Sequence, residues 1–141
     1  MIEWYWLLMM MVALHVFADF HLQGILANLK QKGWWYDEFA KVSVIQSDRT
    51  MPDIMGMYGK DYIVALWLHA FEWSFIVCIP LMWFVGFTWE GACLVLINMA
   101  LHAYVDDLKC NQMEISLVTD QLCHLAQILC TLVLWMMYAG E

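Results

Sequence analysis

Three pairs of histidine and aspartate, each spaced four residues apart, lie within strongly apolar parts of the sequence. The pairs are His15 with Asp19, His102 with Asp106, and Asp120 with His124. Residues four apart share one face of an α-helix, so each pair would direct an imidazole and a carboxylate to one spot. These are side chains with which proteins bind zinc, manganese and non-haem iron. The pairs therefore predict a metal centre built between helices.

The composition indicates a small membrane protein. Of the 141 residues, 64% are hydrophobic, and nine are tryptophan and twelve methionine. This apolar share is far above that of soluble domains. The net charge is −8 and there are only six Lys and Arg residues. Such a chain offers little to a phosphate backbone, so we expect no nucleic-acid partner.

Four apolar runs each approach the roughly 20 residues that a helix needs to cross the hydrocarbon of a bilayer. Their approximate limits are 4–28, 62–86, 87–105 and 115–139. Pro80 lies inside the second run, where a membrane helix tolerates a kink. The sequence therefore predicts an all-α fold, an integral membrane bundle of four transmembrane helices that forms a single domain over residues 1–141.

A polar segment joins the first two runs. Within it, residues 34–45 carry aromatic and apolar side chains, from which we expect an amphipathic helix lying on the bilayer surface. Residues 46–59 contain Pro52, Gly56 and Gly59 and are expected to form a loop. The predicted bundle thus has an interfacial helix and loop between its first two transmembrane helices.

The distribution of basic residues predicts the orientation. All six Lys and Arg residues fall between the first two runs or between the last two. By the positive-inside rule these segments are cytoplasmic, which places both termini outside. We expect the protein in the bacterial inner membrane.

The order of the paired residues reverses when the chain changes direction. Histidine precedes aspartate in the first and third runs, but follows it in the fourth, which crosses the opposite way. Each aspartate would therefore lie nearer the cytoplasm, with its histidine deeper by one turn, roughly 6 Å along the helix. His69 of the second run falls close to the histidine level. We expect all four helices to contribute to one cluster in the cytoplasmic half of the bundle.

Each polar residue near this cluster has an expected role. The predicted metal ligands are His15, Asp19, His102, Asp106, Asp120 and His124. His69 is expected to be a further ligand or a general acid, and Glu72, three residues later, a general base. The residues expected to orient the ligands are Gln23, Asn98, Lys109 and Gln121.

The combined motifs resemble those of a family of small bacterial and phage membrane proteins that has no assigned activity. The matching patterns are His-x-x-x-Asp-Phe-x-x-Gln from His15, a single histidine at His69, His-x-x-x-Asp-x-x-Lys from His102, and Asp-Gln-x-x-His from Asp120, with Lys30 after the first. A more distant likeness is to membrane-bound metal-dependent hydrolases, which also place His and Asp on transmembrane helices. The resemblance implies a helical membrane protein with a metal site.

The favoured function is a metal-dependent hydrolase. Seven ligand candidates exceed the four that one zinc ion takes, so they suit two ions, or one ion with acid and base residues. Zinc, manganese or iron would lower the pKa of a bound water and polarise the scissile group. A substrate would approach from the inner leaflet or the cytosol, as a lipid, a lipid-linked phosphate ester or a peptide near the membrane.

Two other functions stay open at this point. A proton or ion transporter could use the same His and Asp residues without a metal. A bacterial or phage membrane subunit could use the cluster only to fix the register of its helices. The expected partners are membrane lipids, and a second copy of the chain or a host membrane protein would also suit so thin a bundle.

Overall fold

A computed structural model describes residues 3–45 and 51–139, and these residues form helices and short connections without a strand. The elements in chain order are α1 (Trp4–Phe17), the π-helical turn η1 (Ala18–Leu22), α2 (Leu26–Leu29), α3 (Lys32–Ile45), α4 (Met51–Tyr58), α5 (Asp61–Val85), α6 (Trp89–Cys110) and α7 (Leu117–Ala139). The predicted all-α fold is confirmed.

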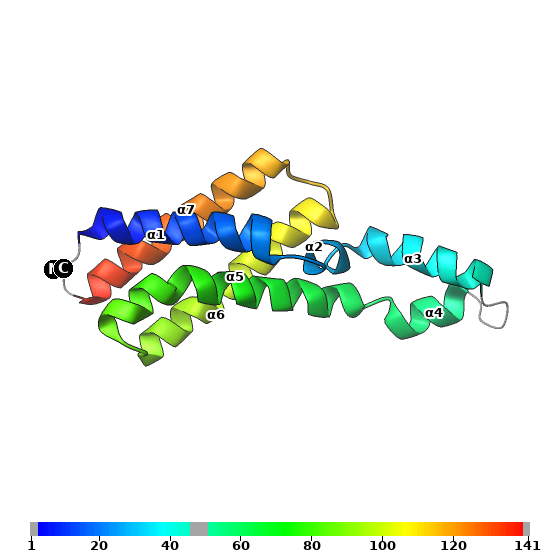
Figure 1. Ribbon diagram of the computed structural model, residues 1–141, viewed down its shortest axis with the longest axis horizontal. Helices are drawn as coiled ribbons and strands as arrows, with labels where there is room; N and C mark the ends of the chain where they lie inside the picture. The colour runs from blue at the N-terminus through cyan, green and yellow to red at the C-terminus, as the bar shows by residue number, and fades with distance from the viewer. Residues whose placement is uncertain (1–2, 46–50, 140–141) are drawn as a thin grey trace.

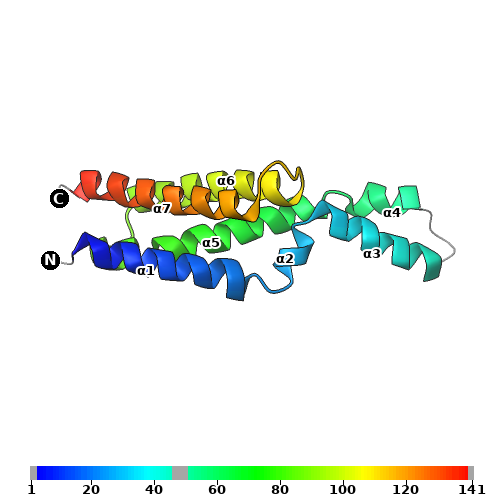
Figure 2. The ribbon, with the colours of Figure 1, turned by 90° about the horizontal axis from the view of Figure 1, so that it is seen from above.

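Four of the helices form a bundle. Helices α1, α5, α6 and α7 run along the long axis of the molecule, and each contacts at least two of the others (Figure 1 and Figure 2). The start of α1 and the end of α7 lie at one end of the bundle, and α2 lies toward the other (Figure 1). Residues far apart in the sequence therefore meet at the same level between the helices.

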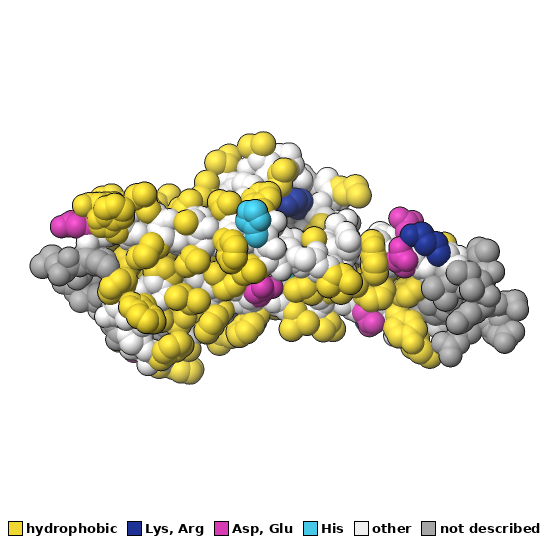
Figure 3. All heavy atoms as spheres, in the orientation of Figure 1, with side chains coloured by type: hydrophobic (Ala, Val, Ile, Leu, Met, Phe, Trp, Pro, Cys, Tyr) yellow, Lys and Arg dark blue, Asp and Glu magenta, His cyan; other side chains and the backbone are white. Residues whose placement is uncertain are grey.

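Four helical stretches are long and apolar enough to cross a membrane. They are Trp4–Leu22, Met55–Phe84, Trp89–Cys110 and Leu117–Tyr138. Hydrophobic side chains cover much of the bundle surface seen in Figure 3, and outward-facing residues such as Leu68, Phe71 and Leu129 are exposed. Soluble monomers rarely expose apolar surface on this scale. The expected number of candidate spans is thus confirmed.

Helix ends differ from the predicted limits of the apolar runs for local reasons. The first stretch stops at Leu22 rather than near residue 28, because Gly24 turns the chain with a positive φ of 48°. Helix α6 begins after Thr88, whose hydroxyl accepts a hydrogen bond from the Gly91 N–H at 3.2 Å. It continues to Cys110, beyond the predicted limit at residue 105. Helix α5 continues through Pro80, as expected.

The segment between the first two spans also differs from expectation. Residues 51–58, expected as loop, form helix α4, while residues 46–50 lie outside the described residues. A helix is present at 32–45 as α3, but it extends along the bundle axis beyond α2 (Figure 1 and Figure 2). A helix lying flat on a bilayer would instead run across that axis.

The bundle interior is divided into an apolar half and a polar half. Its apolar core comprises Leu7, Met11, Ala18, Trp73, Val77, Leu81, Ile128, Leu132 and Trp135. This core fills the half that holds the start of α1 and the end of α7. The paired His and Asp residues lie in the other half, toward α2, where the same helices hold them at a fixed distance.

Candidate metal centre

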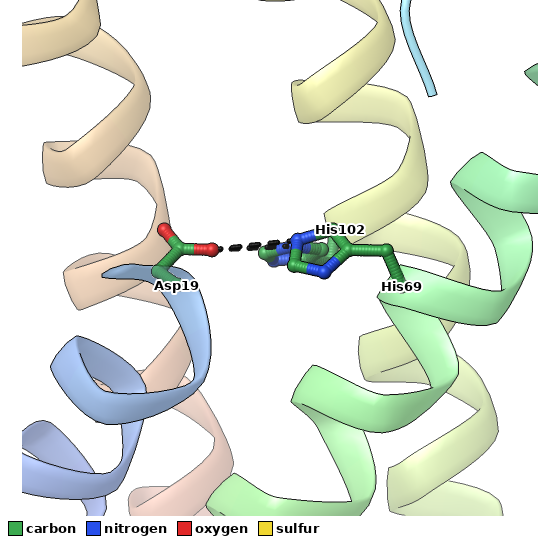
Figure 4. A group of neighbouring side chains, drawn as sticks. All are labelled: Asp19, His69 and His102. Carbon is green, nitrogen blue, oxygen red and sulfur yellow. Dashed lines mark hydrogen bonds and ion pairs between the residues drawn. The ribbon is translucent and has the colours of Figure 1, made fainter. Parts of the chain in front are cut away.

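Three buried side chains from three elements meet at the centre of the polar half. Asp19 of η1 points toward His69 of α5 and His102 of α6 (Figure 4). Its Oδ1 lies 3.4 Å from Nε2 of His69 and 3.9 Å from Nε2 of His102. The two Nε2 atoms are 3.1 Å apart. We call these residues the first group.

Asp106 of α6 adjoins this group and links it to α7. Its Oδ2 lies 3.4 Å from Nε2 of His69 and 3.7 Å from Nε2 of His102. Its Oδ1 faces the other way and lies 3.6 Å from Nε2 of His124. His102, Asp106 and His124 form a second group whose ligand atoms lie within 4.8 Å of one another. We call the residues of both groups, with Asp120, the His/Asp cluster.

Asp120 completes the cluster from the first turns of α7. Its Oδ1 lies 3.2 Å from Nε2 of His124, and both side chains are fully buried. The two atoms lie within ion-pair distance of each other, but neither makes a hydrogen bond of regular geometry within the described residues. Buried polar atoms are normally hydrogen-bonded, so this contact requires an explanation.

The spacing of the first group fits a bound ion. Ligand atoms at about 2.0–2.1 Å from a tetrahedral ion lie roughly 3.3–3.4 Å from one another. His69 Nε2 lies 3.1 Å from His102 Nε2 and 3.4 Å from Asp19 Oδ1, and the third pair of the group, His102 Nε2 and Asp19 Oδ1, is wider at 3.9 Å. Imidazole and carboxylate are also the donors that zinc, manganese and iron accept. The residues present therefore suit such an ion.

A local change in helix geometry positions Asp19. Residues Ala18–Leu22 form a π-helical turn at the end of α1. Such turns are rare, and they often occur at functional sites because the extra residue changes the direction of the side chains. Asp19 thereby reaches α5 and α6, whereas His15, one turn earlier, contacts Trp73 and Gln121.

His15 is placed outside both groups, which differs from the role predicted for it. The Trp73 indole N–H, which can only donate, gives a hydrogen bond of 2.9 Å to His15 Nδ1. His15 is therefore the tautomer with a proton on Nε2, which donates to Gln121 Oε1 at 3.1 Å. Both ring nitrogens are occupied by the protein, so His15 has none to give an ion.

Gln121, held by its hydrogen bond from His15, orients two carboxylates. Its Nε2 donates to Oδ2 of Asp19 and to Oδ2 of Asp120, both at 3.0 Å. A chain of hydrogen bonds thus runs from Trp73 through His15 and Gln121 to two members of the cluster. Gln121, for which the sequence predicts a role in orienting the ligands, thus contacts two of the predicted ligands.

Two lysines neutralise carboxylates of the cluster. Lys30 is buried after α2, and its Nζ lies 2.5 Å from Asp106 Oδ2. Lys109 donates to Asp120 Oδ2 at 2.8 Å, as its predicted role requires. The Asn111 side chain holds the Lys30 segment in place: its amide donates to the Lys30 carbonyl at 3.2 Å and accepts from the Lys32 N–H at 2.7 Å.

The remaining predicted residues divide between the cluster and other places. Gln23 donates to the Asp19 backbone carbonyl and, at 3.2 Å, to Asp19 Oδ1. Asn98 lies outside the cluster and accepts hydrogen bonds from Gln127 and Thr131 through its Oδ1. Glu72 is half-buried, and none of the polar contacts found among residues 3–45 and 51–139 joins it to the cluster.

Sequence reasoning missed the role of Trp73 and gave Lys30 none in the site. Trp73 lies four residues after His69 and so shares its helix face, a signal hidden among the nine tryptophans of the chain. Lys30 follows the turn at Gly24, and its return into the bundle depends on tertiary contacts that no local pattern reveals.

Comparison with known proteins returned no match to a family model, to a curated protein or to a solved structure.

Proposed function

We propose that this protein is a membrane-embedded, metal-dependent hydrolase with its centre in the His/Asp cluster. One observation carries the proposal: buried imidazole and carboxylate groups from η1, α5, α6 and α7 converge with the spacing of metal ligands. Charged side chains at this depth of an apolar bundle are costly, and they are usually kept for function.

The four apolar helices support a position across the membrane. The five Lys residues within the described part of the chain lie after α2, on α3, before α5 and at the end of α6, at or beyond the bundle end that carries α2, so that end would face the cytoplasm. The cluster would then lie in the cytoplasmic half of the bilayer, in a bacterial inner membrane. We also propose kinship with the family of small bacterial and phage membrane proteins, on the motifs alone.

Asp19, His69 and His102 would hold the ion, with Asp106 Oδ2 beside it. When bound, the ion would supply an activated water and polarise the scissile group. The protein contributes orientation, because Gln121 and Gln23 fix Asp19 by hydrogen bonds. It also excludes bulk water from the ligand atoms, since the side chains of both groups are buried.

Lys30 supports an anionic substrate that approaches from the α2 end. Lys30 is buried and forms an ion pair with Asp106, whose Oδ2 lies beside His69 of the first group. A lipid-like ester or a phosphate ester at the inner leaflet would present its polar group there. The long apolar helices would accommodate the rest of such a molecule in the bilayer.

Transport is less well supported by the interior of the bundle. Beyond the His/Asp cluster, Asn98, Gln127 and Thr131 satisfy one another by hydrogen bonds. The apolar core that follows includes Trp73, Leu132 and Trp135. The buried Ser74 beside it donates its hydroxyl to the Ala70 carbonyl of its own helix. A metal site uses the residues of the His/Asp cluster and needs no polar path through the apolar core.

Elemental analysis of detergent-purified protein tests the proposal. We expect the wild type, purified from metal-supplemented cells, to retain a transition metal that is lost in His102→Ala. His21→Ala is the matched control, because His21 is exposed and outside both groups. A stable wild type that retains no metal would overturn the proposal and favour transport or a purely structural role for the cluster.

A further inference from the structure

We infer that the centre holds two ions, with Asp106 as the bridge between them, and that its substrate is a phosphate ester; this rests on the proposed function. The first observation is the position of the Asp106 carboxylate. Its Oδ2 faces Nε2 of His69 and of His102, while its Oδ1 faces Nε2 of His124. A carboxylate placed between two sets of imidazoles can give one oxygen to each ion.

The second position has its own ligand atoms. His124 Nε2 and Asp120 Oδ1 are 3.2 Å apart, and both residues have 0% exposure. Lys109 and Gln121 bind Asp120 through Oδ2 and leave Oδ1, which faces His124 Nε2, without a regular hydrogen bond within the described residues. A cation bound by Asp106 Oδ1, His124 Nε2 and Asp120 Oδ1 would satisfy both atoms, which are costly to bury without a hydrogen bond.

Ring stacking sets the separation of the two positions. The imidazoles of His102 and His124 stack with centroids 4.1 Å apart and an angle of 26° between their planes. Their Nε2 atoms face different oxygens of the same carboxylate, so the two rings point toward Asp106 side by side. The 4.1 Å between these two ligand rings is close to the separation of the ions in sites that bind two metals. Two-metal hydrolytic sites have ions about 3.5–4 Å apart.

The charges favour a phosphate ester as substrate. Asp19, Asp106 and Asp120 carry three negative charges, and Lys30 and Lys109 two positive ones. Histidines bind metal in the neutral form. Two divalent ions and one hydroxide would leave the cluster with two positive charges. A phosphate monoester carries a charge of about −1.5 to −2 at neutral pH, so it would compensate them.

The reaction is hydrolysis of the ester. The oxygen of water forms a bond to phosphorus as the bond to the ester oxygen breaks. One proton of the water goes to the departing ester oxygen, which leaves as an alcohol, and the other stays on inorganic phosphate. Two-metal sites suit this displacement because they stabilise the attacking and the leaving oxygen together.

Manganese loading tests the second position. We expect about two Mn²⁺ per chain in the wild type by elemental analysis, with the EPR spectrum of a spin-coupled pair. Asp120→Asn and His124→Gln remove ligands of the second position only, and each should retain about one ion with an uncoupled spectrum. His69→Gln is the matched variant for the first position, and it should also lose the coupling.

The wild-type measurements decide the inference even if a variant fails to fold. One ion with an uncoupled spectrum would overturn the two-ion centre and leave the proposed function standing. Absence of any ion would overturn both.

For the substrate, we expect release of 4-nitrophenol from 4-nitrophenyl phosphate. Cleavage of 4-nitrophenyl acetate alone would overturn the phosphate-ester assignment, since the two probes share a leaving group.

Discussion

Trp73 Nε1 lies 2.9 Å from His15 Nδ1, and the direction of this hydrogen bond is fixed because an indole can only donate. The bond therefore selects the His15 tautomer, and through Gln121 it orients Asp19 and Asp120. Trp73, whose indole also stacks on the His102 ring with centroids 4.3 Å apart, thus orients two carboxylates of the cluster through hydrogen bonds.

Trp73→Phe should weaken metal binding while leaving the ligands in place. Residues that orient ligands typically contribute about 10–100-fold to metal affinity, and we expect a loss in that range by metal competition. The ¹⁵N shifts of His15 in the metal-free protein should show a change in tautomer. Trp83→Phe is the control, because Trp83 is 80% exposed. Unchanged His15 shifts in Trp73→Phe would contradict the chain of hydrogen bonds.

Lys30→Gln should destabilise the metal-free protein more than the metal-bound one. Without an ion, loss of the Lys30 ammonium leaves Asp106 with an uncompensated buried charge, and breaking such a pair typically costs about 3–5 kcal/mol. A bound cation compensates the same carboxylate. Thermal unfolding in detergent with and without metal measures the difference, and equal losses in the two states would contradict a metal position beside Asp106.

Glu72→Gln should leave hydrolysis close to the wild-type rate, because the Glu72 carboxylate is not joined to the cluster. Asp19→Asn changes a carboxylate in the same way but within the first group, so it should lose the ion held by that group and, with it, activity. Initial rates at matched protein concentrations make the comparison. A comparable loss in both variants would show that Glu72 takes part in the reaction after all.

Gly24→Ala should lower the melting temperature. Gly24 has a φ of +48°, a conformation that costs other residues about 1–2 kcal/mol. Gly33 lies inside α3 with open space around its Cα, so Gly33→Ala should instead stabilise the protein by about 0.5–1 kcal/mol. Opposite shifts in the two variants are the expected result. A stabilised Gly24→Ala would contradict the sharp turn after η1.

The sequence predicted the long helices and the level at which they meet, because apolar length and four-residue spacing are local properties of a helix. It predicted that His102, Asp106 and His124 approach one another, since regular turns join each pair. His15 is expected among the ligands only if a regular α-helix continues from His15 through Asp19, and the π-helical turn η1 interrupts that helix. The contacts of Lys30 and Trp73 depend on how helices rotate against each other, which no local spacing encodes.

Because His124 and Asp120 both belong to α7, the cluster cannot be complete until this helix has joined the other three. Within lipid, helices gain little from hiding apolar side chains from one another, so polar links between them matter more. On the proposed membrane placement, one ion held by η1, α5 and α6 and a second held by α6 and α7 would together join all four helices late in biogenesis. Metal supply would then govern how much of the chain escapes quality-control proteolysis, independently of any catalysis.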